Sequence, residues 1–199
     1  MLSAILSFDQ VVEQFLYIHR TPLLTEFFSW ITLLGDARVI TVLGISMAIV
    51  LLRHHRSDYV AGLATTIFGS VGFSYALKLL VARGRPMPSL AAIDVPGYSF
   101  PSMHAASAIA MYGFIGLMIW KLLRPSHHRM PALSVVALLI ILIGFSRLYL
   151  GVHYPSDVIA GYVIGGVFVW LGHEVSIWLE RRTTNAVWRL RPAHSRKGR

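Results

Sequence analysis

The sequence predicts an all-α membrane protein, a polytopic bundle of transmembrane helices. Hydrophobic residues make up 55% of the 199-residue chain and charged residues only 14%, whereas soluble domains carry about 25% charged residues. Several apolar stretches also approach the length needed to cross a bilayer, about 20 residues. This length suits one domain, so we expect a single integral-membrane domain over residues 1–180 and a basic tail over residues 181–199.

The N-terminal 18 residues differ from the rest of the chain. Apolar residues recur on one side at helical spacing beside a stripe of polar ones; they are Ile5, Val12, Phe15 and Leu16. This pattern predicts an amphipathic helix lying at the membrane interface rather than a sixth crossing. We expect the next segment, residues 21–35, to continue along the surface before the first crossing.

Five later segments are predicted to span the membrane, with a sixth span only if the N-terminal helix also crosses. They cover about residues 37–53, 58–80, 102–122, 132–150 and 156–178. In the last of them Gly161 and Gly165 are four residues apart, a spacing that lets two membrane helices approach closely.

The charge distribution sets the expected orientation. The net charge is +9, and seven of the eighteen Lys and Arg residues follow Glu180. With the connectors around Arg53 and Lys121, one side of the membrane holds twelve of the eighteen, which indicates the cytoplasmic side and contact with anionic lipid. No nucleic-acid-binding motif accompanies the basic tail, so we expect no nucleic-acid partner. The chain has no cysteine, which excludes disulfides and thiolate metal sites.

Two clusters of polar residues fall on the opposite, outward side. Lys78 and Arg85 are seven residues apart, so a helix continued to Pro86 would direct both similarly. Ser102 is placed to cap the N-terminus of the next span. The backbone N–H groups of Met103 and His104 would then lie at a helix N-terminus, which is a natural anion site, although His104 taken alone could simply satisfy a local hydrogen bond.

A third cluster stands between the last two spans, where Arg147, His153 and Asp157 interrupt two uncharged stretches. Each of these residues has an ordinary explanation when it is taken alone. Arg147 could extend toward the interface from a helix end, and Asp157 could favour a helix N-terminus. Together with the other two clusters on one side, however, they indicate a functional site, because charge at the membrane edge is costly.

The three clusters resemble the three-part signature of the type 2 phosphatidic acid phosphatase superfamily, in its membrane-bound lipid phosphatase branch. The matching residues are Lys78, Arg85 and Pro86; Pro101, Ser102 and His104; and Ser146, Arg147, His153 and Asp157. One position departs from the pattern, because Met103 stands where the family usually has Gly. We expect Met103 to affect the room beside the phosphate.

The resemblance implies an integral-membrane phosphatase that works through a phosphohistidine. His153 would be the nucleophile, Asp157 would hold its other ring nitrogen, and His104 would be general acid and then base. The phosphate would be bound by Lys78, Arg85, Ser102, Met103 and Arg147.

We expect no metal and no other cofactor. Metal-dependent phosphatases need several convergent carboxylates, and only Asp36, Asp94 and Asp157 fall on the outward side. The expected partners are membrane lipids and a lipid phosphate or diphosphate substrate, with undecaprenyl diphosphate first and phosphatidylglycerophosphate or phosphatidic acid next. Two alternatives are a lipid phosphotransferase that uses the same site and a non-catalytic protein that binds or transports lipid phosphates.

Overall fold

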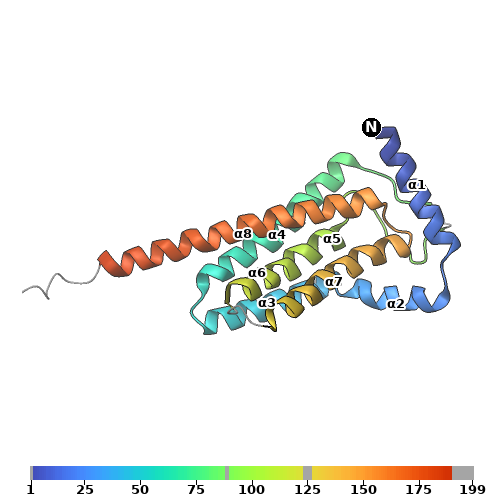
Figure 1. Cartoon of the computed structure of the whole chain (residues 1–199). Coiled ribbons are helices and arrows are strands. Elements are labelled where there is room, and N and C mark those ends of the chain that lie inside the picture. The colour runs from blue at the N-terminus through green and yellow to red at the C-terminus, as the bar shows by residue number, and fades with distance from the viewer. Residues whose placement is uncertain (1, 88–89, 123–126, 190–199) are drawn as a thin grey trace, which may run out of the picture.

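The computed structural model describes residues 2–87, 90–122 and 127–189, and this part of the chain is all-α (Figure 1). The helices are α1 (Leu2–Ile18), α2 (Pro22–Leu33), α3 (Ala37–Arg53), α4 (Ser57–Val81), α5 (Met103–Ala108), α6 (Phe114–Leu122), α7 (Arg129–Tyr149) and α8 (Pro155–Arg189). A π-helical segment, η2 (Ile109–Gly113), joins α5 to α6. The predicted all-α membrane bundle is confirmed.

Four helical stretches in the described residues are long and apolar enough to cross a membrane. They are Ser57–Val81, Met103–Lys121, Arg129–Tyr149 and Pro155–Arg182. The predicted first span, α3, is too short to cross the membrane alone. Its 17 residues cover about 26 Å, whereas the hydrocarbon core is about 30 Å thick. Together with α2, from which it is bent by 41°, α3 makes a fifth candidate span.

Helix α2 does not only continue along the surface, as the sequence predicted for residues 21–35, because it is part of a candidate span with α3. It packs along α7, and the ring of Phe28 is buried 4.8 Å from that of Tyr149, measured between centroids. The break after α2 has a local cause. Asp36 starts α3 as its N-cap, and its side chain accepts a hydrogen bond from the backbone N–H of Arg38 at 2.9 Å.

Small residues bring α8 against α5, as the glycine spacing predicted. A Cβ atom on Gly161 would lie 2.5 Å from the carbonyl oxygen of Ser102, and one on Gly165 would lie 2.7 Å from that of Ala106. Only glycine allows this approach. The close packing fixes the N-terminus of α5 beside the first turns of α8, which is where two of the three predicted clusters lie.

Helix α1 lies across one end of the bundle (Figure 1). At 17 residues it is not among the candidate spans. Its protein-facing side buries Leu16 and, unexpectedly, the carboxylate of Asp9. Large apolar side chains cover its exposed side: Ile5, Phe8, Val11, Phe15 and Ile18. The helix is therefore amphipathic, and its apolar face points away from the protein.

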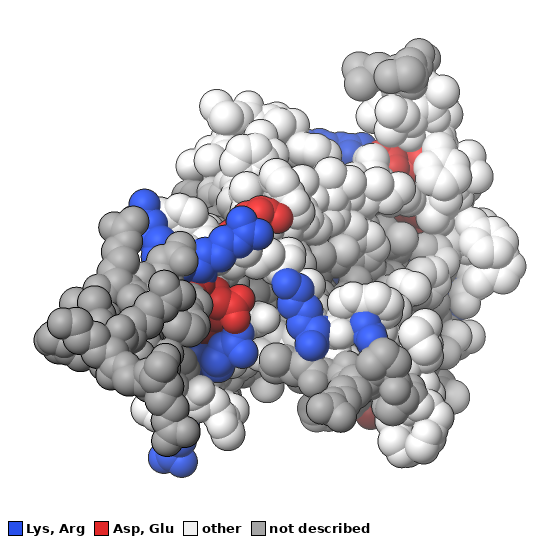
Figure 2. Space-filling view, turned by 60° about the vertical axis from the view of Figure 1, so that its left-hand side comes forward, with Lys and Arg blue, Asp and Glu red and all other residues white. Residues whose placement is uncertain are grey.

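Helix α8 projects beyond the opposite end of the bundle (Figure 1). It continues as a helix through the start of the predicted tail, and residues 190–199 of that tail lie outside the described residues. At this end Arg56 bonds Asp58 at 3.0 Å and lies 3.5 Å from Glu180. Lys and Arg side chains gather here, as Figure 2 shows.

Candidate active site

A pocket of about 440 Å³ lies at the α1 end of the bundle, and six of the eight predicted site residues line it. These are Lys78, Arg85, Met103, His104, Arg147 and His153. The other two, Ser102 and Asp157, are fully buried and do not line it. Residues more than 70 positions apart in the chain therefore meet around one cavity.

His153 and Asp157 face each other across the turn that leads into α8. The Nδ1 atom of His153 lies 3.5 Å from Oδ2 of Asp157. This is long for a hydrogen bond, and Nδ1 has no closer partner among the described residues. The backbone N–H of Tyr154 donates to the same Oδ2 at 2.9 Å. Because Nδ1 faces the carboxylate, Nε2 is the ring nitrogen left to react.

The imidazole of His153 is almost completely buried, with 5% of the residue exposed. Burial lowers the pKa of His153 to about 4, and the nearby Arg147 adds to this effect while Asp157 opposes it. The ring is therefore neutral at physiological pH. A neutral imidazole has a free electron pair and can act as a nucleophile.

Ser102 is the N-cap of α5, as predicted. Its Oγ accepts a hydrogen bond from the backbone N–H of Ala105 at 3.5 Å. Its own N–H donates to the carbonyl oxygen of Asp157 at 3.0 Å, which joins the starts of α5 and α8. The first N–H groups of a helix have no partner within the helix. The N–H groups of Met103 and His104 are the first of α5, and both residues line the pocket. An anion bound in the pocket would be favoured by these free donors.

Lys78 and Arg85 reach the pocket by a different route from the one the sequence suggested. Helix α4 ends at Val81, and Ala82 takes a left-handed conformation with φ 47°, so no helix continues to Arg85. Both cations bind backbone carbonyls of the following loop. Lys78 donates to Tyr98 at 2.6 Å, and Arg85 donates to Val152 at 2.8 Å and to two loop carbonyls.

Arg147 is buried in the last turn of α7, with 2% of the residue exposed. One of its terminal nitrogens donates to Oγ1 of Thr32 at 2.7 Å. Its Nε has no partner within the described part of the chain. A buried guanidinium with an unsatisfied N–H is costly, and an anion in the pocket would satisfy it.

Sequence reasoning missed Arg83. This residue lies two positions before Arg85 and binds the far side of Asp157, donating to its Oδ1 at 2.7 Å. Its other terminal nitrogen donates to Asp9 of α1, also at 2.7 Å. The sequence showed Arg83 only as a further cation in the predicted outward connector. A helix continued from Lys78 to Arg85 would not direct Arg83 to the same side as those two residues, so the sequence gave it no role.

Asp36 also lines the pocket. The sequence predicted this residue on the same side as the three clusters but gave it no function. Within the described residues no group of three or more His, Asp and Glu side chains is arranged to hold a metal ion. The charge that faces the pocket is mainly positive, which suits an anionic ligand such as phosphate.

Known proteins similar to this chain were identified by sequence and by structure. Residues 63–181 match the sequence model of the PAP2 superfamily. The chain is 28% identical over 169 residues to "Phosphatidylglycerophosphatase B" of Bacillus subtilis (strain 168), covering 82% of this chain and 80% of that protein. It is 35% identical over 127 residues to "Decaprenylphosphoryl-5-phosphoribose phosphatase" of Mycobacterium tuberculosis, covering 62% and 64%.

A crystal structure shares the fold. It is described as the first transmembrane PAP2 type phosphatidylglycerolphosphate phosphatase from Bacillus subtilis, and it superposes with a TM-score of 0.74. The sequences are 26% identical, and the match covers 86% of this chain and 85% of the other.

Proposed function

The chain belongs to the PAP2 superfamily of metal-independent phosphatases and is a membrane lipid phosphatase, and we propose that it works through a phosphohistidine at His153. One observation carries the proposal. A buried, neutral His153 lies beside Asp157 and shares its pocket with His104 and three cations.

The first step transfers phosphate to the enzyme. Nε2 of His153 attacks phosphorus, an N–P bond forms, and the P–O bond to the lipid breaks. His104 gives a proton to the departing oxygen, so the lipid leaves as a neutral alcohol or as its lower phosphate. Asp157 stabilises the positive charge that develops on the imidazole, as the acidic member of a catalytic triad does.

The second step releases the phosphate. His104, now without its proton, takes one from a water molecule, and the water oxygen attacks phosphorus. The N–P bond breaks, inorganic phosphate leaves, and both histidines return to their starting state. The same residue therefore serves as acid in the first step and base in the second.

The three cations neutralise the phosphate in both steps. Lys78, Arg85 and Arg147 line the pocket, and preorganised charge of this kind is the main contribution a protein makes to phosphoryl transfer. The backbone N–H of Met103 adds a donor at the start of α5. Ser102 does not line the pocket and contributes by capping the start of the helix that carries this donor.

The hydrophobic part of the substrate leaves the pocket between α3 and α4. Apolar and aromatic side chains line this side: Ile40 of α3, and Ile67, Phe68, Val71 and Tyr75 of α4. Phe68 and Tyr75 are also exposed on the outside of the bundle. A lipid could thus place its head in the pocket while its chain stays in the bilayer.

We expect phosphatidylglycerophosphate to be the first substrate to test, ahead of undecaprenyl diphosphate. The relative that matches 82% of this chain is named for that lipid phosphate. The relative named for a phosphorylated polyprenyl sugar, decaprenylphosphoryl-5-phosphoribose, matches a smaller share, 62%. Phosphatidic acid completes the panel because it shares the phosphate ester on an apolar anchor.

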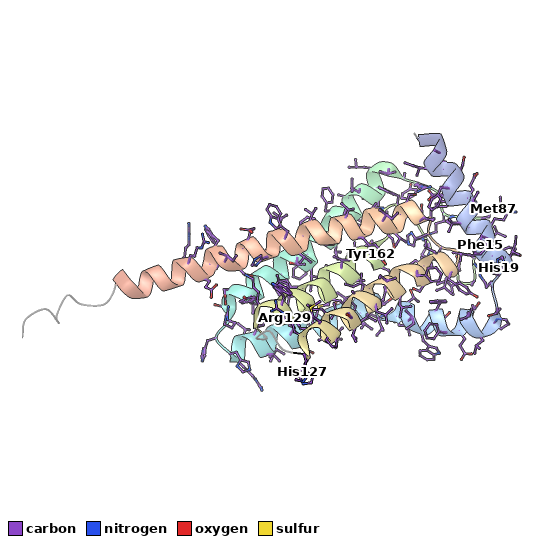
Figure 3. All side chains as sticks on the ribbon, viewed as in Figure 1. Phe15, His19, Met87, His127, Arg129 and Tyr162 are labelled. Carbon is purple, nitrogen blue, oxygen red and sulfur yellow. The ribbon has the colours of Figure 1, made fainter. Side chains whose placement is uncertain are left out.

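The pocket faces the extracytoplasmic side in this proposal. The support is the distribution of positive charge, which favours the cytoplasm for the opposite end. In Figure 3, Arg129 and His127 lie at one end of the bundle and Met87 lies at the other. Met87 is two residues after Arg85 of the pocket, so it marks the end that holds the site.

The test is release of phosphate from the three lipids by purified protein in EDTA. We expect hydrolysis of at least one lipid, and a rate lower by about a thousandfold or more for His153→Ala. His128→Ala, at an exposed histidine outside the pocket, should keep the parental rate. Parental activity in His153→Ala would exclude this nucleophile. Activity that EDTA abolishes and magnesium restores would exclude the metal-independent mechanism, and phosphate appearing on a second lipid would indicate a phosphotransferase.

A further inference from the structure

Asp9 of α1 is a buried carboxylate that the mechanism above does not use. Only 1% of the residue is exposed. It accepts hydrogen bonds from Arg83 at 2.7 Å, from the backbone N–H of Ser156 at 3.0 Å and from the Ser156 hydroxyl at 2.5 Å. A buried charge that is fully paired in this way is held in one position.

Arg83 lies between two carboxylates. One terminal nitrogen of its guanidinium donates to Asp157 at 2.7 Å and also to the Ser156 hydroxyl at 2.7 Å, and the other donates to Asp9. The Cζ atom of Arg83 also lies over the ring of Tyr154, 4.2 Å from its centroid. A continuous set of contacts thus runs from Asp9 through Arg83 to Asp157 and ends at the imidazole of His153.

The charges in this set explain why a second carboxylate is useful. Without Asp9, the positive charge of Arg83 would cancel the negative charge of Asp157. Asp157 could then stabilise the positive charge that forms on His153 only weakly. Asp9 balances Arg83, so the three groups together keep one negative charge beside the imidazole. Because the site is buried, such charge differences act strongly.

We infer that Asp9 is a positioning residue for phosphoryl transfer: through Arg83 it fixes the orientation and the effective charge of Asp157, and it makes α1 a part of the catalytic apparatus. The inference rests on the proposed role of His153 as nucleophile. It assigns Asp9 no contact with the substrate, so its loss should affect the chemical step rather than binding.

A plain structural role, in which Asp9 only attaches α1, makes different predictions. α1 is held by other contacts as well. Leu16 is buried in an apolar cluster with Tyr149 and Leu150, and the neighbouring Arg20 donates to the carbonyl of Leu90 at 2.6 Å. Asp9→Asn, which keeps the shape of the side chain, should therefore leave the protein folded.

The experiment follows formation of the phosphoenzyme by rapid quench, with label in the terminal phosphate of whichever lipid the parent hydrolyses fastest among phosphatidylglycerophosphate, undecaprenyl diphosphate and phosphatidic acid. The amplitude of the burst counts working sites, and its rate constant reports the chemistry. For Asp9→Asn we expect a rate constant at least tenfold lower with KM within twofold of the parent. Glu26→Gln removes an exposed carboxylate of α2 and should match the parent. A parental rate constant in Asp9→Asn, or a change in KM alone, would overturn the inference.

Two further variants test the route through Arg83. The losses in Asp9→Asn and Arg83→Gln should not add in the double variant, because the two residues act in series; additive losses would contradict the inference. Arg83→Lys keeps the charge but cannot bridge two carboxylates with a planar fork, so its rate constant for phosphoenzyme formation should be lower than that of the parent. This variant tests the inference even if Asp9→Asn fails to fold. A parental rate for Arg83→Lys would also overturn the inference.

The outcome for the parent protein separates the two proposals. If the parent forms no phosphoenzyme that depends on His153, the proposed function fails whatever the Asp9 variants do. If the parent is labelled at His153 and Asp9→Asn is labelled just as fast, only the inference about Asp9 fails.

Discussion

At the scale of one residue, burial prepares His153 for the role of nucleophile proposed above. An exposed imidazole would be partly protonated near neutral pH and would then be unable to attack phosphorus. In the turn before α8, burial is the main cause that lowers the pKa of His153 to about 4. The carboxylate of Asp157 lies 3.5 Å from Nδ1, close enough to stabilise the positive charge that the proposed reaction would place on the ring.

The His153 ring should therefore titrate well below other histidines. NMR of histidine-labelled protein, with the signal assigned by its loss in His153→Asn, should give a midpoint near pH 4 rather than near the ordinary value of 6.5. Since the unfolded chain binds a proton at the higher pH, the free energy of unfolding should fall as pH drops from about 6.5 toward 4. A midpoint at the ordinary value would show that the ring is not desolvated.

At the scale of the element, the site depends on how closely two helices pack. α5 carries the proposed acid near its N-terminus, and the proposed nucleophile immediately precedes α8. The hydrogen bond from Ser102 N–H to the Asp157 carbonyl joins the two helix starts. Gly161 and Gly165 allow the helices to approach closely enough for it to form.

Gly165→Ala should separate these helices and slow catalysis. The added methyl group would lie 2.7 Å from the Ala106 carbonyl oxygen and 2.8 Å from Cβ of Ile109, so one helix must shift. We expect a loss of about 1–3 kcal/mol in the free energy of unfolding, as for other overpacked sites, together with a lower kcat. Denaturant unfolding and phosphate release would measure both.

The neighbouring Gly166 provides the matched control, because a methyl group there meets nothing within 4 Å. Gly166→Ala should be neutral or slightly stabilising, since alanine favours a helix by up to about 1 kcal/mol over glycine. Equal effects of the two substitutions would show that the contact between α5 and α8 does not determine the geometry of the site.

At the scale of the whole molecule, charge separates the two ends of the bundle. One end holds the pocket and the three cations that line it, Lys78, Arg85 and Arg147. The other holds Arg56 with its acidic partners Asp58 and Glu180, and the exposed cations at the start of the tail. This asymmetry supports a site that meets lipid head groups on one side of the membrane and an opposite end that meets the anionic cytoplasmic leaflet.

Much of this organisation could be predicted from local patterns. Apolar length indicated the spans, and the cap at Ser102 and the packing at Gly165 followed from residue type and spacing. The route of the chain between elements could not be predicted this way. Ala82 is an ordinary helix former, yet it ends α4 in a left-handed conformation, and a periodic pattern gives no sign of such an end.

The Asp9–Arg83 pair was also out of reach of sequence reasoning. The two residues are 74 positions apart and meet only because α1 lies across the end of the bundle. By helical spacing, Asp9 falls at the edge of the polar stripe of this amphipathic helix. Its burial depends on which face of α1 turns toward the protein, and helical spacing does not decide that.

The central claim is that His153 carries the phosphate. The most direct measurement is to quench the enzyme during turnover of phosphate-labelled lipid and to locate the label by peptide mass spectrometry under alkaline conditions. The account predicts a phosphate that is stable in alkali, labile in acid, bound to His153, and missing in His153→Ala. Turnover with no labelled enzyme, or label on another residue, would contradict it.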